Sequence, residues 1–431
     1  MSTITAVPAS ASVSADLRHV VVVSRKTPIA LAIITALAAL LYALAPRPGY
    51  THFRFSESGD PVHVPTLTVD GMTTAWLSVV IITALVVVSV AYVAAKRKVP
   101  VWVPIVFALV AIVGFLAWAG AGSTAEYPVV SLLRGSMLLA VPLVFGAMGG
   151  VIGERAGVVN IAIESQLLFG AFGAAIFGSL THNPYVGTLA AIVAGVLVAL
   201  VLGVFAIKYR VDQIIVGVVL NVLVYGLTDF LYSQVLVPNG TTLNTTVRFE
   251  RLAIPGLSQI PVIGPALFRQ TILVYVMYIT VPIVWFALYR TRWGLRLRAV
   301  GEHPQAADTV GIKVERVRYR ALAIAGAVVG IGGAYYTMVS VQSFGREMTA
   351  GAGYIALAAV IFGKWDPVRA ALAALLFGAA TNLQGTLSVV GAPVPSQFML
   401  MLPYVVTILA VAGFVGRSRA PAADGTPYIK E

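Results

Sequence analysis

The sequence has 431 residues, of which 59% are hydrophobic and only 11% are charged, and it contains no cysteine. Soluble domains contain about 45–50% apolar residues and could not bury this much apolar surface, and the lack of cysteine excludes disulfides, thiolate metal sites and cysteine nucleophiles. The net charge of +12 comes from basic residues in short segments between apolar runs, which indicates membrane topology rather than nucleic-acid binding.

Apolar runs long enough to cross a bilayer as helices, about 20 residues each, recur along the whole chain. The expected spans are 27–45, 75–95, 100–120, 129–149, 160–180, 185–207, 213–235, 270–290, 319–340, 352–363, 368–385 and 397–415. The run 352–363 is too short to cross as a straight helix, so it predicts a re-entrant or broken helix. The predicted fold is an all-α polytopic membrane protein with about 10–12 transmembrane helices.

The first span ends in Ala43, Leu44 and Ala45, a small-residue pattern that resembles a signal-peptidase site. The apolar run is long for a signal-peptide core, however, and Pro46 follows it directly. We therefore expect an uncleaved first transmembrane helix. At the other end of the chain, the polar tail 416–431 contains two prolines, and we expect it to be disordered.

Lys and Arg are distributed unevenly between the two sides of the predicted spans. With the amino terminus inside, all but seven of the 29 basic residues fall on the inner side, which is the positive-inside pattern. The seven others are Arg47, Arg54, Arg134, Arg248, Arg251, Arg269 and Arg346. This pattern predicts cytoplasmic termini and long outer segments at 46–74 and 236–269; the second either docks a partner or is a solvated connector.

The sequence contains no Walker A loop, HExxH zinc helix or serine-elbow motif, so no nucleotide hydrolysis or familiar hydrolase reaction can be located in it. We expect no catalytic residue, no metal site and no cofactor bound by this chain. His303, which has no second ligand near it in the sequence, is expected to be a surface residue.

Ionisable groups inside apolar spans are costly and often functional, and Glu164 is the clearest example here. Asn160 and Glu164 would lie on one face if their segment is helical. A polar substrate pathway is therefore predicted, with hydrogen bonds that only join helices as the alternative. Its candidate residues are Asn160, Glu164, Ser165, Gln166, Asn221, Asn382 and Gln384.

Small residues predict where helices pack closely. Gly326 and Gly330 form a GxxxG pair, and Gly146, Gly149 and Gly150 form a second glycine-rich edge. We interpret both as packing features.

The inner loop 298–312 is long for a connection between spans and is bordered by several arginines. Pro304 is suited to start a short helix and Gly311 to end it, while Ala306 and Ala307 would give that helix a small face. Such a helix on the inner side of the membrane is suited to enter a cleft of a soluble partner.

The segment Gln305 to Gly311 resembles the EAA-x3-G coupling motif of ABC importer permeases, with Gln305 in place of the usual Glu. Three longer strings are similar to the permeases of simple-sugar, nucleoside and branched-chain amino acid importers, and most of all to the nucleoside branch: GGVIGERAGVVNIAIESQLLFGAFGAA (149–175), VDQIIVGVVLN (211–221) and RAVGEHPQAADTVGI (298–312). The resemblance covers about residues 130–415, and Ser165 stands where the family has Gly.

This resemblance implies the permease subunit of an ATP-driven nucleoside importer in a bacterial plasma membrane, coupled to its ATPase through Gly301, Glu302, Pro304, Gln305, Ala306, Ala307 and Gly311. The implied partners are a homologous second permease in a heterodimer, a cytoplasmic ATPase that binds ATP and Mg²⁺, and an extracytoplasmic binding protein or lipoprotein. The expected organisation is a cytoplasmic segment 1–26, an extension 27–128 with three spans, a permease core 129–415 and a cytoplasmic tail 416–431.

Other functions remain open at this stage. A simple-sugar or branched-chain amino acid permease would share the same motifs. An ion-coupled secondary transporter would need carboxylates at mid-membrane, where only Glu164 lies well within a span, and would leave the basic inner loop unexplained. A membrane-embedded enzyme would need a convergent acid, base or metal set, which the sequence does not offer, and residue types do not exclude a channel or a scaffold.

Overall fold

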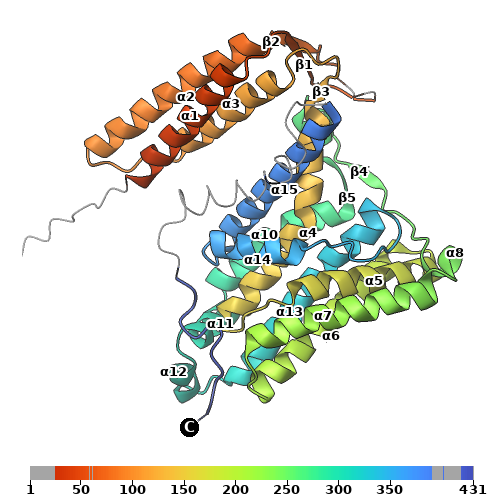
Figure 1. Ribbon diagram of the computed structural model, residues 1–431. Helices are drawn as coiled ribbons and strands as arrows, with labels where there is room; N and C mark the ends of the chain where they lie inside the picture. The colour runs from red at the N-terminus through yellow and green to blue at the C-terminus, as the bar shows by residue number, and fades with distance from the viewer. Residues whose placement is uncertain (1–24, 58, 61, 391–400, 402–418, 431) are drawn as a thin grey trace, which may run out of the picture. The chain divides into compact units, whose positions relative to one another are not determined.

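The structure is a computed structural model that describes residues 25–57, 59, 60, 62–390, 401 and 419–430 (Figure 1). Its long helices are α1 (Lys26–Leu44), α2 (Gly71–Ala94), α3 (Trp102–Ala119), α4 (Val129–Arg155), α5 (Ile163–Thr181), α6 (Pro184–Gly203), α7 (Gln213–Leu231), α10 (Ile272–Arg290), α13 (Val314–Tyr335) and α15 (Pro367–Val390). The shorter helices are α8 (Gly240–Leu243), α9 (Ile263–Leu267), α11 (Arg292–Glu302), α12 (Pro304–Thr309) and α14 (Ala352–Phe362).

Two small sheets complete the described fold. The strand order of the first is β2-β1-β3, with β1 (Tyr50–Arg54) antiparallel to β2 (Leu67–Asp70) and parallel to β3 (Tyr127–Pro128). The second pairs β4 (Arg251–Ala253) with β5 (Arg269–Thr271) in antiparallel register, with Leu252 opposite Gln270.

Within the described residues, ten helices are long and apolar enough to cross a membrane, so the prediction of an all-α polytopic membrane protein is confirmed. Single π-helical turns at Val204–Lys208, Tyr232–Leu236 and Tyr336–Ser340 lengthen α6, α7 and α13. The expected span 397–415 lies outside the described residues except for Met401.

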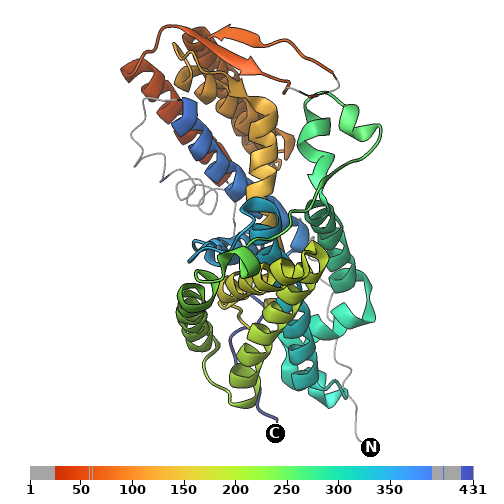
Figure 2. The same ribbon diagram turned by 90° about the vertical axis from the view of Figure 1, so that its right-hand side faces the viewer.

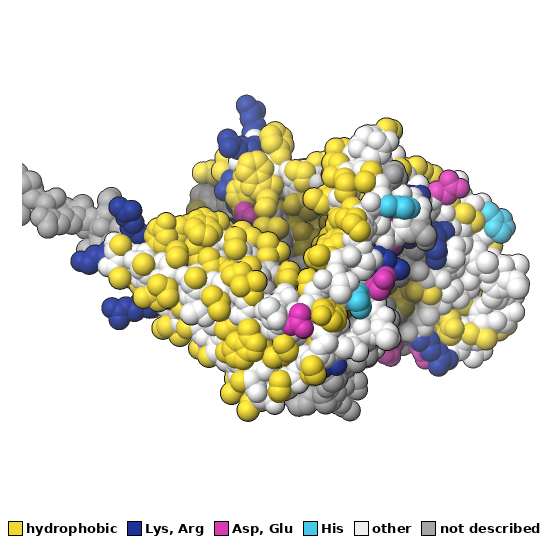
Figure 3. Space-filling model, turned by 90° about the horizontal axis from the view of Figure 1, so that it is seen from above, with side chains coloured by type: hydrophobic (Ala, Val, Ile, Leu, Met, Phe, Trp, Pro, Cys, Tyr) yellow, Lys and Arg dark blue, Asp and Glu magenta, His cyan; other side chains and the backbone are white. Residues whose placement is uncertain are grey.

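The chain divides into two compact units, Met1–Pro46 with Ala75–Phe115, and Arg47–Thr74 with Leu116–Glu431. In the smaller unit, Leu31, Ile82, Leu85, Val103 and Phe107 form a buried cluster. The face of these helices that Figure 3 shows is largely apolar, and their exposed side chains include Ile33, Leu37, Val80, Val87 and Leu109. An apolar exterior of this kind suits contact with lipid tails.

The larger unit is built around α4, α5, α6, α13 and α15, whose facing surfaces form its hydrophobic core. The predicted GxxxG pair lies at the contact between α13 and α6. A Cβ at Gly330 would lie 2.3 Å from the Ala191 carbonyl oxygen, and one at Gly326 would lie 2.5 Å from the Gly195 carbonyl oxygen. The interpretation of this pair as a close packing site is therefore confirmed.

The helix α14 has 11 residues, which gives a length of about 16 Å and is too short to cross a bilayer. A non-helical segment, 341–351, connects the end of α13 to α14 and leads the chain back into the interior of the larger unit. The side chains of Ala356, Ala359 and Val360 belong to the hydrophobic core. The predicted short helix at 352–363 is therefore present, and its exposed backbone ends require partners within the protein.

The larger unit has two distinct ends (Figures 1 and 2). Strands β1 to β5 lie at one end, which we call the sheet end, while α11, α12 and the described C-terminal residues lie at the opposite end, which we call the loop end. Residues 419–430 pack against the loop end, with Pro421 and Ala423 buried. For these residues the expected disorder was wrong, because backbone and side-chain hydrogen bonds attach them to α11 and α13.

We predict that Gly330→Ala lowers the stability of the detergent-solubilised protein, because its new methyl group would meet the Ala191 carbonyl at 2.3 Å and overpacking costs about 1–3 kcal/mol. Gly226→Ala is the matched control: it lies in α7 with no atom within 4 Å of the position that its methyl group would take, so a small gain is expected. Melting temperatures of both variants decide the point. Equal values would show that the α6–α13 contact tolerates a side chain.

Candidate functional site

A fully buried carboxylate connects three elements in the larger unit. Glu164 lies in the first turn of α5. Its Oε1 accepts hydrogen bonds from the hydroxyls of Tyr225 and Thr349, both at 2.6 Å, and from the Gly351 N–H at 2.9 Å. Its Oε2 accepts from the Gly353 N–H at 2.6 Å. Glu164 thus joins α5 to α7 and to the N-terminus of α14, where free N–H groups favour a negative charge.

The polar side chains next to Glu164 also have hydrogen-bond partners within the protein. The side-chain amides of Asn160 and Gln166 bond each other in both directions at 3.2 Å. The Oδ1 of Asn221 in α7 accepts from the Ser165 N–H at 3.0 Å, while its Nδ2 donates to the Ile161 carbonyl and the Tyr354 hydroxyl. Hydrogen bonds that join helices, the alternative considered from the sequence, are present for Glu164, Ser165 and Asn221, whereas Asn160 and Gln166 form a local pair.

The expected helical face shared by Asn160 and Glu164 is not present. The helix α4 ends at Arg155, Gly157 has a φ of +81°, and α5 begins only at Ile163. Because a left-handed residue interrupts the helical path, Asn160 lies in the connection between the two helices, where its side chain meets Gln166 instead.

A cavity of about 430 Å³ opens toward the sheet end of the larger unit. This volume lies within the range of about 300–1,000 Å³ that is usual for ligand pockets. Its walls come from α4, the segment 248–251, β5, the end of α13 with the π-helical turn that follows it, and α15. The lining residues are Gly135, Leu138, Leu139, Pro142, Arg248, Phe249, Arg251, Gln270, Thr271, Tyr335, Tyr336, Val339, Ser340 and Asn382.

Of the seven predicted pathway residues, only Asn382 lines this cavity. Its Nδ2 donates to the Leu132 carbonyl at 2.7 Å, which leaves its Oδ1 near Gly135. Gln384 lies two residues further along α15, half-buried and outside the lining. A pathway role for the other six stays a prediction; in the structure, five of them lie in the polar cluster around Glu164.

The sequence analysis missed the aromatic and basic lining of the cavity. Phe249, Tyr335 and Tyr336 give it three rings, and Arg248 and Arg251 give it positive charge. The arginines of the outer segment 236–269 could have indicated this lining, but the sequence analysis used them only to assign the membrane topology. Tyr336 also packs against both core clusters, so it joins the cavity wall to the part of the core beside α5 and α7.

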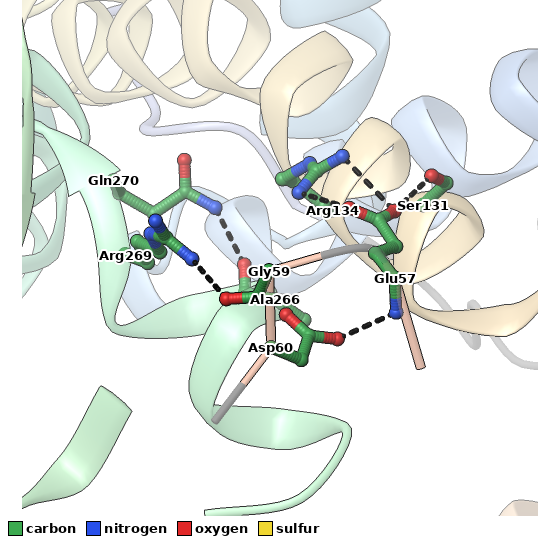
Figure 4. A network of polar contacts seen from close by, with 8 residues as sticks. All are labelled: Glu57, Gly59, Asp60, Ser131, Arg134, Ala266, Arg269 and Gln270. Carbon is green, nitrogen blue, oxygen red and sulfur yellow. Dashed lines mark hydrogen bonds and ion pairs between the residues drawn. The ribbon is translucent and has the colours of Figure 1, made fainter. Parts of the chain in front are cut away.

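A smaller hollow of about 250 Å³ lies beside the cavity and shares Arg251 with it. Here the loop after β1 contacts α4: Glu57 accepts a hydrogen bond from Ser131 and pairs with Arg134, at 2.9 Å between Nη1 and Oε2 (Figure 4). Arg269 donates to the Gly59 carbonyl at 3.3 Å. Segment 47–74, which precedes the core in sequence, therefore forms part of the sheet end.

Several charged side chains lie close together in this smaller hollow. Burial acts to raise the pKa of Glu57, yet the hydrogen bond from Ser131 and the charge of Arg134 together hold it below its usual value. Burial, and after it the nearby charge of Arg134, lowers the pKa of Arg251. The hollow is lined by three arginines, Arg134, Arg251 and Arg269, and by two acidic residues, Glu57 and Asp60, so its charges largely compensate one another.

At the loop end, α12 has the predicted boundaries. Pro304 is its first residue, and Gly311, with a φ of +85°, follows its end. The expectation of a small face made by Ala306 and Ala307 together is wrong, because Ala306 is exposed whereas Ala307 packs with Val300 and Val314. Adjacent helical residues point about 100° apart.

The other predicted coupling residues also include both buried and exposed ones. Gly301 is buried and its carbonyl accepts the N–H of Ala423, while the carboxylate of Glu302 accepts the N–H of Ala422. The exposed residues of α12 are Gln305, Ala306 and Thr309, and Val310 and Gly311, which follow the helix, are exposed as well.

These features define a polytopic helical membrane protein with a ligand-sized cavity at one end and a short exposed helix at the other. Residues 132–411 match the family model described as the permease component of the branched-chain amino acid transport system. Two relatives of this chain are each 40% identical, with 69% of this chain and 96% of the relative covered: the guanosine ABC transporter permease protein NupQ of Bacillus subtilis and the nucleoside ABC transporter permease protein NupC of Lactococcus lactis.

A putative glucose ABC transporter permease protein, TsgC13 of Haloferax volcanii, is 37% identical over 59% of this chain and 76% of its own length. The Bacillus and Lactococcus strains each also contain a second, more distant permease relative. The chain belongs to this family of ABC importer permeases. Residues before 132 lie outside the family match.

We predict that Glu164→Ala strongly destabilises the protein, because four donors, two of them in buried and two in part-buried hydrogen bonds, would lose their acceptor. Each unsatisfied buried donor costs about 1–3 kcal/mol. Asp229→Ala on the neighbouring helix α7 is the control, since its ion pair with Arg346 is exposed and worth about 0–1 kcal/mol. Thermal unfolding in detergent measures both. A melting temperature for Glu164→Ala equal to that of Asp229→Ala would contradict the connecting role.

Proposed function

We propose that this chain imports nucleosides as the permease subunit of an ABC transporter in a bacterial plasma membrane. The observation that carries this proposal is the composition of the cavity. Three aromatic residues, Phe249, Tyr335 and Tyr336, line a space that is also lined by Gln270, Thr271, Ser340 and Asn382. Rings are suited to stack on a base, and amides and hydroxyls are suited to bond the base edges and ribose hydroxyls.

The charge pattern favours a nucleoside over a branched-chain amino acid. Arg248 and Arg251 could hold a carboxylate, but no Asp or Glu is among the described residues that line the cavity. An amino acid would therefore leave its ammonium group without a counter-charge, which is costly in a desolvated site. Glucose would use the polar groups and one ring but has no base to fill the aromatic part. The names of the two 40% identical relatives, for guanosine and for nucleosides, also support this choice.

We further propose that the chain pairs with a second, homologous permease in a heterodimer, in keeping with the second permease relatives in the same bacteria. In this proposal the sheet end faces outward and receives the nucleoside from an extracytoplasmic binding protein, and the termini and the loop end are cytoplasmic. A separate ATPase binds ATP and Mg²⁺, this chain binds no cofactor, and α12 transmits the motion of the ATPase to the membrane helices. The basic loop 290–320 supports this orientation.

Uptake of radiolabelled guanosine tests the substrate. In a host without its own nucleoside importers that expresses the chain with its native partners, excess unlabelled nucleoside should abolish uptake, whereas glucose and leucine should leave it unchanged. Tyr336→Ala should raise the KM about tenfold, since base stacking contributes about 1–3 kcal/mol.

Tyr209→Ala is the matched control for this variant, because Tyr209 is exposed and outside the cavity. Competition by glucose or leucine, or an unchanged KM for Tyr336→Ala, would count against a nucleoside in this cavity.

We predict that Ala306→Trp blocks ATPase binding, because Ala306 lies on the exposed face of α12. The protein should stay inserted and stable, while co-purification of the ATPase and uptake are lost. Ala307→Trp provides the contrast: this side chain is buried among Val300 and Val314, so the substitution should lower stability as well. Uptake by Ala306→Trp at the wild-type rate would exclude α12 as the ATPase contact.

A further inference from the structure

The C-terminal segment 419–430 is attached to the loop end by contacts on both sides of α12 (Figure 1, dark blue). The Ala423 N–H donates to the Gly301 carbonyl at 2.9 Å, and the Ala422 N–H donates to Glu302 at 3.2 Å. Further along, Lys430 pairs with Asp308 of α12 at 3.4 Å. The segment therefore meets the residue pair just before α12 and then α12 itself.

The middle of this segment is inserted between helices. Arg318 of α13 is 1% exposed, and its Nη1 donates to the Thr426 carbonyl at 3.2 Å. Asp424 lies near enough for its charge and that of Arg318 to act on each other. On the other side, a Cβ at Gly157 would lie 3.1 Å from the Ala423 carbonyl. The segment thus lies between α13 and the connection that follows α4.

The helix α12 needs this kind of support. It has six residues, and isolated helices shorter than about 12–15 residues are marginal in water. Its one buried side chain, Ala307, packs in a small cluster with Val300 and Val314, and Tyr428 of the C-terminal segment packs against that cluster. The segment therefore supplies part of the apolar contact that fixes the inward face of α12.

The contacts of the segment show whether it supports α12 or blocks the face of α12 that a partner would bind. Tyr428 lies against the cluster on the buried side of α12, and Lys430 reaches the half-buried Asp308. Gln305, Ala306, Thr309 and Val310 remain exposed. The segment thus leaves the outward face of α12 free for a partner.

We propose that residues 419–430 form a C-terminal brace that holds α12 in the orientation required for ATPase binding, so that they are positioning residues for coupling. This inference rests on the proposed function for the identity of the partner. The brace itself is a property of this chain and is testable without the partner. These residues lie beyond the part of the chain that matches the family model, 132–411.

Thiol labelling tests whether the brace is attached, because the chain contains no native cysteine. Ala422 is exposed and Ala423, the next residue, is buried. In inverted membrane vesicles without ATPase, Ala422→Cys should react with a maleimide at least about tenfold faster than Ala423→Cys, and mild denaturant should remove the difference. Equal rates in native vesicles would overturn the brace.

A matched pair of variants tests its effect on coupling. Tyr428→Ala removes the side chain that packs against the α12 cluster, whereas Ile429→Ala changes an exposed neighbour. With the ATPase that co-purifies from the native host, Tyr428→Ala should reduce ATPase retention and nucleoside uptake about tenfold, equivalent to about 1.4 kcal/mol, at unchanged membrane levels. Ile429→Ala should match the wild type.

The outcomes separate the two proposals. If the wild-type chain retains no ATPase, the proposed function fails, while the labelling experiment still decides whether the brace exists. If the wild type retains the ATPase and Ala306→Trp does not, but Tyr428→Ala behaves as Ile429→Ala does, the function stands and the positioning role of the brace is excluded. Faster uptake by Tyr428→Ala would indicate obstruction instead and would also overturn the proposal.

Discussion

The carboxylate of Glu164 is the interaction on which the arrangement of the larger unit depends. A fully buried negative charge is tolerated only when donors surround it, and here Tyr225, Thr349 and the N-terminal N–H groups of α14 supply them. The same carboxylate lies at the N-terminus of α14, the positive end of the helix dipole, where an acidic group is stabilising. A helix too short to cross the bilayer is thereby fixed inside the protein, with its free backbone groups satisfied.

This constraint links the two ends of the molecule. The helix α14 follows α13, and the last turn of α13 carries Tyr336, which lines the cavity at the sheet end. The first residues of α13 lie at the loop end, where Val314 packs against α12 and Arg318 against the C-terminal segment. One continuous helix therefore contacts both the ligand-sized cavity and α12, which suits a permease that transmits motion from one side of a membrane to the other.

Much of the fold was predictable because membrane spans and helix boundaries depend on local sequence: apolar length gave the spans, and Pro304 and Gly311 gave the limits of α12. The site was less predictable because tertiary contacts decide which polar residues meet. Gly157 interrupts the helix that would have aligned Asn160 with Glu164. Phe249 joins Tyr335 and Tyr336 in the cavity wall only because the segment 236–271 folds back against the end of α13. Ala307 likewise belongs to a small cluster against which Tyr428, more than 100 residues away, packs.

We propose that this permease moves nucleosides only when a separate ATPase drives it. The most direct measurement is guanosine uptake into proteoliposomes that contain the complex purified from the native host, with ATP and Mg²⁺ supplied on the side of the ATPase and no ion gradient. The account predicts accumulation that requires ATP and the binding protein and that stops when a non-hydrolysable analogue replaces ATP. Accumulation driven by a proton or sodium gradient without ATP would contradict it and would identify the chain as a secondary transporter.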